Sequence, residues 1–534
     1  MNQGGGAARQ SWGTRIGVIF AVMGSAVGLG NFLRFPGKAA QYEGGAFMIP
    51  YFIALLVLGI PLAWAEWAMG RYGGIRGHNS TPGIYRTIWK RAAAPYFGVL
   101  GMIVPVIIYM YYVFIESWCL AYAWYTATGQ LALGNDATKY KSFFDGFVGK
   151  DADGFLVIGG GGVSPAVIAL AICFVVNFAL IYRGISKGIE KFCLFAMPLL
   201  ILCAIIVLVR VLTLAPYEGR SVLDGLGYMW NPHTQTGGSF WKSLANGQMW
   251  LEATGQIFFS LSVGFGIIIT YSSYLKRNDD VALSALTSNA GNEFCEVALG
   301  GLITIPAAFV FLGIAGVAGQ GTFDLGFVVL PQVFQVMPMG QFVGSLFFFL
   351  LFLAAVTSSL SMLQPAIALL EDGLGVGRKA SVAMLGFITL IGSLFVVYFS
   401  KNLTALDTMD FWIGTFCIFV LATFQTILFG WVLGIDKGME EINRGGNIRI
   451  PRLVGYVLKY VAPVYLGAIF VTWLYQEINR PAEKGNYFKS LADSPVAALT
   501  VAFIGIVALL FIFLIARSVQ RWKQIEQREE EVRI

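Results

Sequence analysis

Polar side chains that could bind a cation lie in the middle of long apolar stretches of this sequence. Thr357 and Ser358 occupy one stretch, and Asn292, Glu293 and Glu296 occupy another. Hydroxyl, amide and carboxylate oxygens are the ligands that a hard cation prefers. Hydroxyls within a helix often bond to their own backbone, and acidic side chains can also clamp helices together. These residues alone therefore leave a binding role and a structural role open.

Two of the apolar stretches, the first and the sixth, share the pattern G-x-G. The pattern runs from Gly28 to Gly30 in one and from Gly264 to Gly266 in the other. Glycine weakens a helix by about 1 kcal/mol relative to alanine, so both helices are predicted to break. A break frees N–H groups, which suit a carboxylate, and carbonyls, which suit sodium. Close packing of helices at Gly24 and Gly28 is the alternative.

The composition requires that these stretches cross a membrane. Of 534 residues, 57% are hydrophobic and 12% are charged, against about 45–50% and about 25% in soluble proteins. A helix needs about 20 apolar residues to cross a bilayer, and spans in lipid are helical when the apolar runs are long. The sequence therefore predicts an all-α membrane protein with twelve spans, near residues 13–35, 42–70, 95–123, 164–183, 190–214, 242–275, 285–317, 340–370, 380–399, 404–434, 453–475 and 494–516.

Basic residues gather in alternate loops between the predicted spans. The loop after the second span contains Arg71, Arg76 and Arg86, whereas residues 318–338 contain neither Lys nor Arg. Because basic loops stay in the cytoplasm, both termini are predicted to be cytoplasmic. The net charge of +6 follows from this bias, so no nucleic-acid partner is expected.

The sequence lacks the residue sets of most other functional classes. Its six cysteines have no metal-ligand spacing, it has only two histidines, and no nucleophile–base pair stands out, so an enzyme is not expected. Rings of charge or a repeated filter motif, which are typical of ion channels, are also missing. A membrane sensor that binds a small molecule without carrying it stays open.

At these residues the sequence resembles the neurotransmitter:sodium symporter family, and especially its bacterial amino-acid transporters. The resemblance implies a LeuT-like five-plus-five inverted repeat with unwound helices 1 and 6. The implied domains are a cytoplasmic N-terminus (1–12), a transport core (13–435), peripheral helices 11 and 12 (436–517) and a cytoplasmic tail (518–534). The stretches that carry the resemblance are WGTRIGVIFAVMGSAVGLGNFLRFP, GGAFMIPY, EWAMGRYGG, YYVFIESW, RGISKGIEKF, GQIFFSLSVGFG, LTSNAGNEFCEVALGG, TFDLGFVVLP, AVTSSLSMLQP, MDFW and EEINRGG.

The resemblance implies two sodium sites built from oxygen ligands. The first would use the Ala26 carbonyl and the side chains of Asn31, Ser260 and Asn292, completed by the substrate carboxylate. The second would use the carbonyls of Gly24, Val27 and Ala354 and the hydroxyls of Thr357 and Ser358.

The resemblance also implies a site for an amino acid next to these ions. Its residues would be Ala26, Leu29, Gly30, Ile108, Tyr112, Phe259, Ser260, Ser262, Phe265, Ser358 and Met362. Relatives that carry monoamines have Asp where this chain has Gly28, so an amino acid is expected rather than an amine. The pocket wall is apolar and disfavours a charged substrate side chain.

Four further positions are implied to form two gates, and one acidic residue is implied to set the dependence on chloride. By resemblance, Arg34 and Asp410 would close the outer side, and Arg9 and Asp372 the inner side. Chloride-dependent relatives have Ser where this chain has Glu296, so transport is expected to be chloride-independent, with Glu296 a candidate for proton uptake on the return step.

Two departures from the family pattern are Ser25, in place of Asn, and Phe294, in place of Lys. The sequence therefore predicts a sodium-coupled importer of small neutral, hydrophobic L-amino acids in a bacterial cytoplasmic membrane, with two Na⁺ ions and no chloride. The alternatives are an amino-acid sensor and a sodium symporter for another small zwitterion. The oligomeric state is left open, with a dimer as one option.

Overall fold

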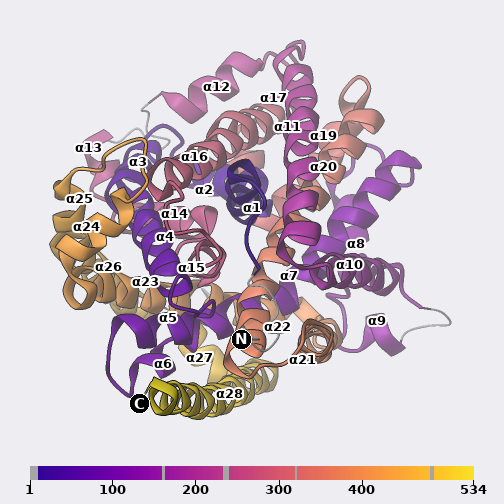
Figure 1. Cartoon of the computed structure of the whole chain (residues 1–534). Coiled ribbons are helices and arrows are strands. Elements are labelled where there is room, and N and C mark those ends of the chain that lie inside the picture. The colour runs from indigo at the N-terminus through magenta and orange to yellow at the C-terminus, as the bar shows by residue number, and fades with distance from the viewer. Residues whose placement is uncertain (1–9, 159–162, 232–239, 319–320, 481–485, 534) are drawn as a thin grey trace.

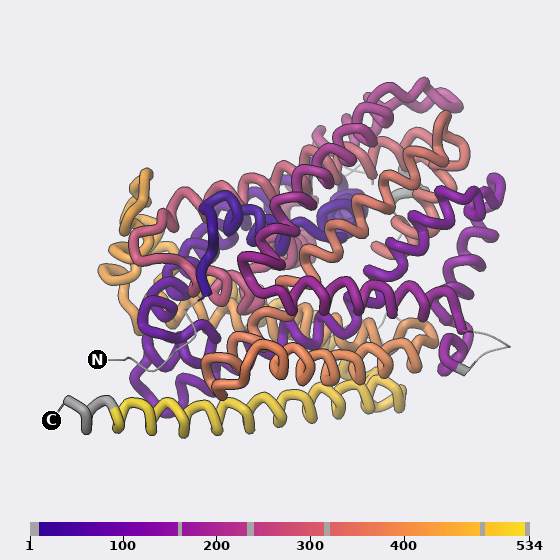
Figure 2. The backbone as a smooth tube through the Cα atoms, turned by 45° about the vertical axis from the view of Figure 1, so that its right-hand side comes forward, coloured from indigo at the N-terminus to yellow at the C-terminus, as the bar shows by residue number. Residues whose placement is uncertain are grey.

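The computed structural model describes residues 10–158, 163–231, 240–318, 321–480 and 486–533, and these residues form helices without any strand. The predicted all-α class is confirmed. Figure 1 shows the helices packed into one bundle, and Figure 2 shows the bundle turned by 45°.

The first half of the chain, up to the end of the sixth predicted span, contains helices of very different lengths. They are α1 (Arg15–Ala26), α2 (Phe35–Gln41), α3 (Met48–Ala54), α4 (Ile60–Gly74), α5 (Thr81–Ile88), α6 (Ala94–Phe97), α7 (Leu100–Ala127), α8 (Ala137–Val148), α9 (Phe155–Ile158), α10 (Pro165–Tyr182), α11 (Lys191–Leu212), α12 (Val222–Trp230), α13 (Phe240–Leu244), α14 (Gly247–Leu261) and α15 (Ile267–Ser272).

The second half continues in the same way after the break between α14 and α15. Its helices are α16 (Val281–Glu293), α17 (Leu302–Ala318), α18 (Thr322–Asp324), α19 (Leu330–Val336), α20 (Gly340–Ala368), α21 (Arg378–Tyr398), α22 (Thr404–Met409), α23 (Ile418–Ile427), α24 (Ile435–Asn443), α25 (Arg452–Tyr456), α26 (Ala462–Asn479), α27 (Tyr487–Asp493) and α28 (Pro495–Arg533).

Ten continuous helical segments of the described chain are long and apolar enough to cross a membrane. They are Met48–Gly74, Ala94–Ala127, Pro165–Tyr182, Ile185–Leu212, Val281–Gly313, Gly340–Gly373, Arg378–Tyr398, Lys401–Asn443, Arg452–Asn479 and Pro495–Arg528. A bent pair, Arg15–Ala26 with Gly30–Gln41, makes eleven if it is one span. The chain is therefore a multi-pass membrane protein. The sixth predicted span is not among the ten or eleven, because it consists of the two short helices α14 and α15.

The break after α1 comes from an extended residue between two helical turns. Val27 has ψ of 105° and ends α1, and a π-helical turn begins at Gly30. The helices on either side are bent by 49°. At the other end of α1, the Glu190 carboxylate accepts hydrogen bonds from the N–H groups of Gly13 and Thr14, at 2.8 and 2.9 Å. These contacts fix the start of α1, and its other end at Val27 is where the helix breaks.

The break between α14 and α15 depends on left-handed backbone. Ser262, Gly264 and Gly266 have φ of 55°, 76° and 81°, values that favour glycine. A Cβ on Gly266 would also lie 2.5 Å from the carbonyl oxygen of Gly101 on α7. Glycine is thus required at Gly266 both for the turn and for the close approach of α7.

The two breaks meet inside the bundle. Figure 1 shows α1 near the middle, where it packs against α11, α16 and α20, and α7 lies along α20. The Ser262 hydroxyl donates to the carbonyl of Ser25, at 3.0 Å. This bond links the break after α14 to the last turn of α1, just before the other break. The first described residues and the C-terminal end of α28 lie at the same end of the bundle (Figure 2).

A buried ion pair ties α4 to α24. The Arg71 guanidinium donates to the Glu441 carboxylate at 2.7 Å, and their side chains are 0% and 3% exposed. Arg71 also donates to the carbonyls of Asp279, Glu441 and Arg444. Because the guanidinium is removed from water, its charge depends on these acceptors.

We expect Glu441→Gln to lower the melting temperature of the purified protein, because it leaves the buried Arg71 charge without its carboxylate. Breaking a buried pair costs about 3–5 kcal/mol. Glu440→Gln is the matched control, since Glu440 pairs with Arg444 at the surface and such pairs contribute about 0–1 kcal/mol. Thermal unfolding followed by tryptophan fluorescence measures both. Equal melting temperatures for the two variants would contradict this account.

Candidate functional site

Carbonyl oxygens of α1 converge on one hydroxyl of α20. The Ser358 hydroxyl oxygen lies 3.4, 3.2 and 3.4 Å from the carbonyl oxygens of Gly24, Ser25 and Val27. A serine hydroxyl has a single hydrogen, so it satisfies at most one of these carbonyls fully. The others keep lone pairs that point into the same small space.

Thr357 packs against the same part of α1. A Cβ on Gly24 would lie 3.1 Å from the Thr357 Cβ, and the Thr357 hydroxyl donates within its own helix, to the carbonyls of Leu353 at 3.2 Å and Ala354 at 2.9 Å. The structure thus brings together all five residues predicted for the second sodium site. Their donor set of neutral oxygens fits a hard monovalent cation.

Three side chains predicted for the first sodium site form a chain of hydrogen bonds. Asn31 donates to the Asn292 side-chain oxygen at 2.9 Å, and Asn292 donates to the Ser260 hydroxyl at 2.7 Å. Ala26, the predicted source of a carbonyl ligand, is the last residue of α1 and directly precedes the break. The three polar side chains therefore meet where the turn after α1 faces α14 and α16.

Glu296 lies next to this group and is completely buried. One carboxylate oxygen accepts from the Tyr51 hydroxyl at 3.0 Å and from the Gln256 amide at 2.9 Å. The other accepts from the Asn31 amide at 3.1 Å and from the Ser260 hydroxyl. Three uncharged donors and the Tyr51 hydroxyl, whose single hydrogen is shared with Glu293, thus surround the carboxylate, an arrangement that stabilises its negative charge without a cation.

Tyr51 and Gln256 were not predicted as partners of Glu296. Gln256 lies four residues before Ser260, so both side chains occupy one face of α14. This spacing in the sequence could have predicted that both contact the same residue. Tyr51 lies in the stretch GGAFMIPY, which carries the family pattern but implied no role for this tyrosine. Its hydroxyl also lies 2.7 Å from Glu293, which places both acidic residues of the seventh predicted span around one phenol.

Residues predicted to bind the substrate close around the break in α1. The Leu29 N–H donates to the Tyr112 hydroxyl at 3.5 Å. A Cβ on Gly28 would lie 3.0 Å from that hydroxyl, and a Cβ on Gly30 would lie 2.9 Å from the ring of Phe259. The glycines therefore let α7 and α14 approach the freed backbone closely.

The remaining predicted substrate residues lie in the core. Ile108, Phe265 and Met362 are buried, and the rings of Phe259 and Phe265 meet edge-to-face with centroids 6.2 Å apart. No hydrogen bond or ring contact links Ile108 or Met362 to the other predicted residues within the described ranges, so their place in the site rests on burial in α7 and α20.

The two departures from the family pattern have different surroundings. The Ser25 hydroxyl lies 2.7 Å from that of Ser361, a residue without a predicted role, and 3.4 Å from that of Ser262. Three hydroxyls thus replace the larger amide of relatives. Phe294 is 48% exposed on the outside of the bundle, as expected for an apolar residue that faces lipid.

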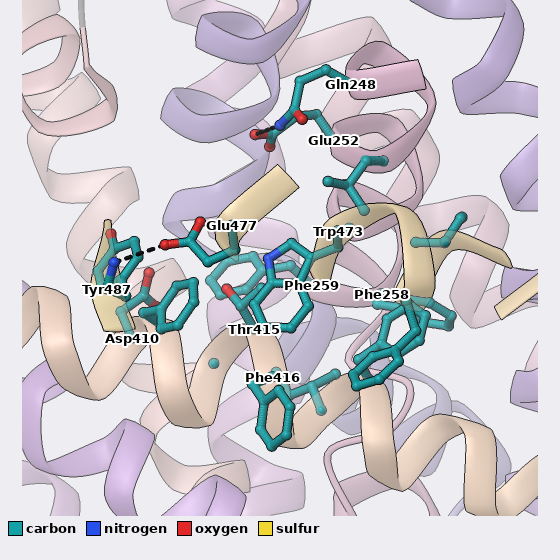
Figure 3. A pocket seen from close by; sticks show the side chains of 18 of the residues that line it. Gln248, Glu252, Phe258, Phe259, Asp410, Thr415, Phe416, Trp473, Glu477 and Tyr487 are labelled. Atoms are coloured by element: carbon teal, nitrogen blue, oxygen red, sulfur yellow. Dashed lines mark hydrogen bonds between the residues drawn. The ribbon is translucent and has the colours of Figure 1, made fainter. Parts of the chain in front are cut away.

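A cavity of about 330 Å³ opens beside Phe259 and is lined by both residues of the predicted outer gate, Arg34 and Asp410. Figure 3 shows this cavity, with Phe259 and Asp410 labelled. The two gate residues do not pair. Arg34 donates to Gln256 at 3.0 Å and lies 5.0 Å from the centroid of the Phe259 ring, while Asp410 accepts from the Tyr111 hydroxyl at 2.7 Å.

The predicted inner gate is only partly described. Arg9 lies outside the described residues. The Asp372 carboxylate accepts from the N–H groups of Asn79 and Ser80, at 2.7 and 3.1 Å, and from the Ser80 hydroxyl at 3.0 Å. Asp372 therefore closes the loop before α5 onto the end of the eighth predicted span.

The sequence and the fold match known transporters. The sequence model of the Sodium:neurotransmitter symporter family matches residues 9–148 and 156–523. An uncharacterized sodium-dependent transporter of Methanocaldococcus jannaschii is 31% identical, over 86% of this chain and 89% of its own length. A sodium-dependent nutrient amino acid transporter of Drosophila willistoni is 27% identical, over 87% of this chain and 78% of its own.

A solved structure has the same fold. The crystal structure of MhsT in complex with L-phenylalanine superposes with a TM-score of 0.73 at 27% identity, covering 87% of this chain and 99% of that one. Family match, relatives and fold agree, and the chain belongs to the sodium:neurotransmitter symporter family of sodium-dependent transporters.

Proposed function

We propose that this protein is a sodium-coupled secondary active symporter that imports small neutral, hydrophobic L-amino acids by alternating access. The observation that carries the proposal is the convergence of the Ser358 hydroxyl on three α1 carbonyls, beside the freed N–H of Leu29. A cation cage and an anion-binding backbone at one break can link the binding of ion and amino acid. The Drosophila nutrient transporter and MhsT with L-phenylalanine support this substrate class.

The proposal includes a LeuT-like arrangement of twelve spans. The bent pair α1 and α2 would be the first span and the broken pair α14 and α15 the sixth. Residues 13–435 would form the transport core and 436–517 the peripheral helices, with 1–12 and 518–534 in the cytoplasm of a bacterium. The basic loops support this orientation, and so does the position of both ends of the described chain on one side (Figure 2).

The substrate would lie across the break in α1. Its carboxylate would accept from the N–H groups of Leu29 and Gly30 and from the Tyr112 hydroxyl. Its amine would donate to the carbonyls of Ala26, Phe259 and Ser260. Its side chain would face Ile108, Phe259, Ser262, Phe265, Ser358 and Met362. Gly28 brings no carboxylate to this place, and a Cβ there would lie 3.0 and 3.1 Å from the hydroxyls of Tyr112 and Ser358, so the substrate itself would have to supply the carboxylate.

Two sodium sites are part of the proposal. Asn31, Ser260, Asn292 and the Ala26 carbonyl would hold the first ion, and the substrate carboxylate would complete its shell. Gly24, Val27, Ala354, Thr357 and Ser358 would hold the second. When bound, sodium supplies the positive charge that makes the shared cavity favourable for a carboxylate. The chain's own contribution is to fix the oxygens before the ion arrives, which lowers the entropy cost of binding.

Glu296 would make chloride unnecessary. Its carboxylate lies among four donors, from Tyr51, Gln256, Asn31 and Ser260. A set of uncharged donors around one point would also suit a chloride ion. A fixed carboxylate there supplies the same negative charge beside the first sodium site, and a proton taken up by Glu296 would neutralise it on the return step.

The cavity beside Phe259 would be the outer entrance. With Arg34 bound to Gln256 and Asp410 to Tyr111, the gate pair is apart. Closure would require Arg34 to exchange Gln256 for Asp410, over the bound amino acid. Ligands shift such an equilibrium only through different affinities for the two states, so sodium would favour the open form and the amino acid the closed one.

The driving force suffices for accumulation. A zwitterion carries no net charge, whereas each sodium ion gains about 2.3 kcal/mol per 100 mV. At 100 mV two ions would give about 4.6 kcal/mol, and each tenfold step in the accumulation of the amino acid requires about 1.4 kcal/mol. The potential alone would therefore support roughly thousand-fold accumulation.

We expect proteoliposomes containing the protein to take up labelled L-leucine under an inward sodium gradient and not under potassium. Ser358→Ala should reduce uptake at least about tenfold, because it removes a hydroxyl of the cation cage. Ser359→Ala, which changes the next hydroxyl on the same helix, is the matched control and should keep uptake within about twofold.

Competition by each unlabelled amino acid ranks the substrates in the same assay. Sodium-dependent binding without uptake would favour a sensor. Competition by a different zwitterion but by no amino acid would favour the other symporter. No response to sodium at all would overturn the proposal.

We expect wild-type uptake to be unchanged when chloride is replaced by gluconate, and Glu296→Ser to make uptake depend on chloride. The serine variant removes the fixed charge and opens space among the donors that surround it. Glu293→Gln removes the neighbouring carboxylate, which also contacts Tyr51, and should stay insensitive to chloride. Stimulation of the wild type by chloride would refute this role for Glu296.

A further inference from the structure

A second buried carboxylate lies in the core, and the proposed mechanism does not use it. Glu116 of α7 is 0% exposed. Its carboxylate accepts from the Ser359 hydroxyl at 2.5 Å and from the side-chain amide of Asn177, at 3.3 and 3.1 Å to its two oxygens. Ser359 and Asn177 are also fully buried. In the part of the chain that the structure describes, Glu116 takes part in no ion pair.

The groups around Glu116 are donors. Asn177 turns its NH₂ group toward Glu116 and toward the hydroxyl of Tyr109, whereas its oxygen is buried and has no partner among the described residues. A protonated carboxyl group would need an acceptor; with Asn177 in this orientation that amide offers Glu116 only donors, and the Ser359 hydroxyl is the neighbour that could accept. This orientation suits an ionised carboxylate, which only accepts.

Glu116 lies between two parts of the candidate site. Ser359 directly follows Ser358, whose hydroxyl faces the α1 carbonyls. On α7, Tyr112 is one helical turn before Glu116 and accepts from the Leu29 N–H. Through Ser359 the carboxylate is thus bonded to the residue next to Ser358, and on α7 it lies one helical turn from Tyr112.

The two proposed sodium sites differ in their charge. The first has the Glu296 carboxylate bonded to two of its residues, Asn31 and Ser260, and would also receive the substrate carboxylate. The second has only neutral carbonyls and hydroxyls. Placing a cation in a buried, low-dielectric region without a compensating negative charge is costly.

We propose that Glu116 is the positioning residue that supplies the compensating negative charge for the second sodium site, from behind Ser359 and without touching the ion. The proposal rests on the function proposed above. A purely structural role is the competing explanation, since Glu116 also joins α7, α10 and α20 through its hydrogen bonds. The two explanations differ because one depends on the charge and the other on the bonds.

The test uses purified full-length protein in detergent without any amino acid, so that the first site lacks the substrate carboxylate. Binding of ²²Na⁺ is titrated at constant ionic strength with choline, and the rise in melting temperature with sodium is a second readout. We expect Glu116→Gln, which keeps the shape and removes the charge, to raise the half-saturating sodium concentration about tenfold, the size expected for losing one nearby charge.

Two further variants separate charge from bonding. Ser359→Ala and Glu116→Asp both remove or lengthen the short bond to Ser359, and both keep the carboxylate. The half-saturating sodium concentration of each variant should stay within about threefold of the wild-type value, whereas a structural role of Glu116 predicts weaker sodium binding in both. This pair decides the question even if Glu116→Gln does not fold.

The outcomes are distinct. Unchanged sodium binding in Glu116→Gln, or the same loss in Ser359→Ala, would overturn the role of Glu116 while leaving the sodium sites in place. A wild-type protein that binds no sodium, with Thr357→Val indistinguishable from it, would instead overturn the proposed function.

Discussion

Backbone polar groups at membrane depth need partners, because an unpaired N–H or carbonyl in hydrocarbon costs several kcal/mol. Two helices of this bundle break at that depth, and side chains supply the missing partners, one from the turn that follows the break and one from a neighbouring helix. The Gly28 N–H donates to the Asn31 side chain at 2.8 Å, and the Gly264 N–H donates to Glu66 at 3.1 Å. Buried polar side chains such as Asn31 thus satisfy the backbone at a break and also belong to the candidate site.

The same constraint explains why a broken helix can bind ligands without being unstable. A carbonyl oxygen has two lone pairs, so a carbonyl that accepts from Ser358 still has one for a cation. The Asn31 oxygen that accepts from Gly28 is likewise a group that can turn to an ion. Satisfying the backbone and forming a site are therefore compatible, provided that the partners come from rigid helices such as α7, α16 and α20.

Much of this arrangement was predictable from the sequence, and the reasons are local. Glycine pairs predicted both breaks, and the runs of apolar residues predicted the helical spans. The predicted count of twelve spans differs from the ten or eleven found in the described chain, because the break from Ser262 to Gly266 leaves two helices that are each too short to count as a span. Contacts between distant segments were not predictable by spacing. The separation of Arg34 from Asp410 is a property of one conformation, and the bonds from Tyr51 to Glu293 and Glu296 join two spans that are distant in the sequence.

The placement of carboxylates near the site has a physical consequence for which cation it suits. Carboxylates that bind a metal directly favour divalent ions such as Ca²⁺ and hold them tightly. In this bundle Glu296 and Glu116 each bond to neutral side chains, so on the proposed assignments neither carboxylate touches its cation and each acts by its charge. A negative charge one step removed attracts a cation without offering it a strong ligand. The result is a pair of cages that a monovalent ion can enter and leave, which a transporter requires and a structural metal site does not.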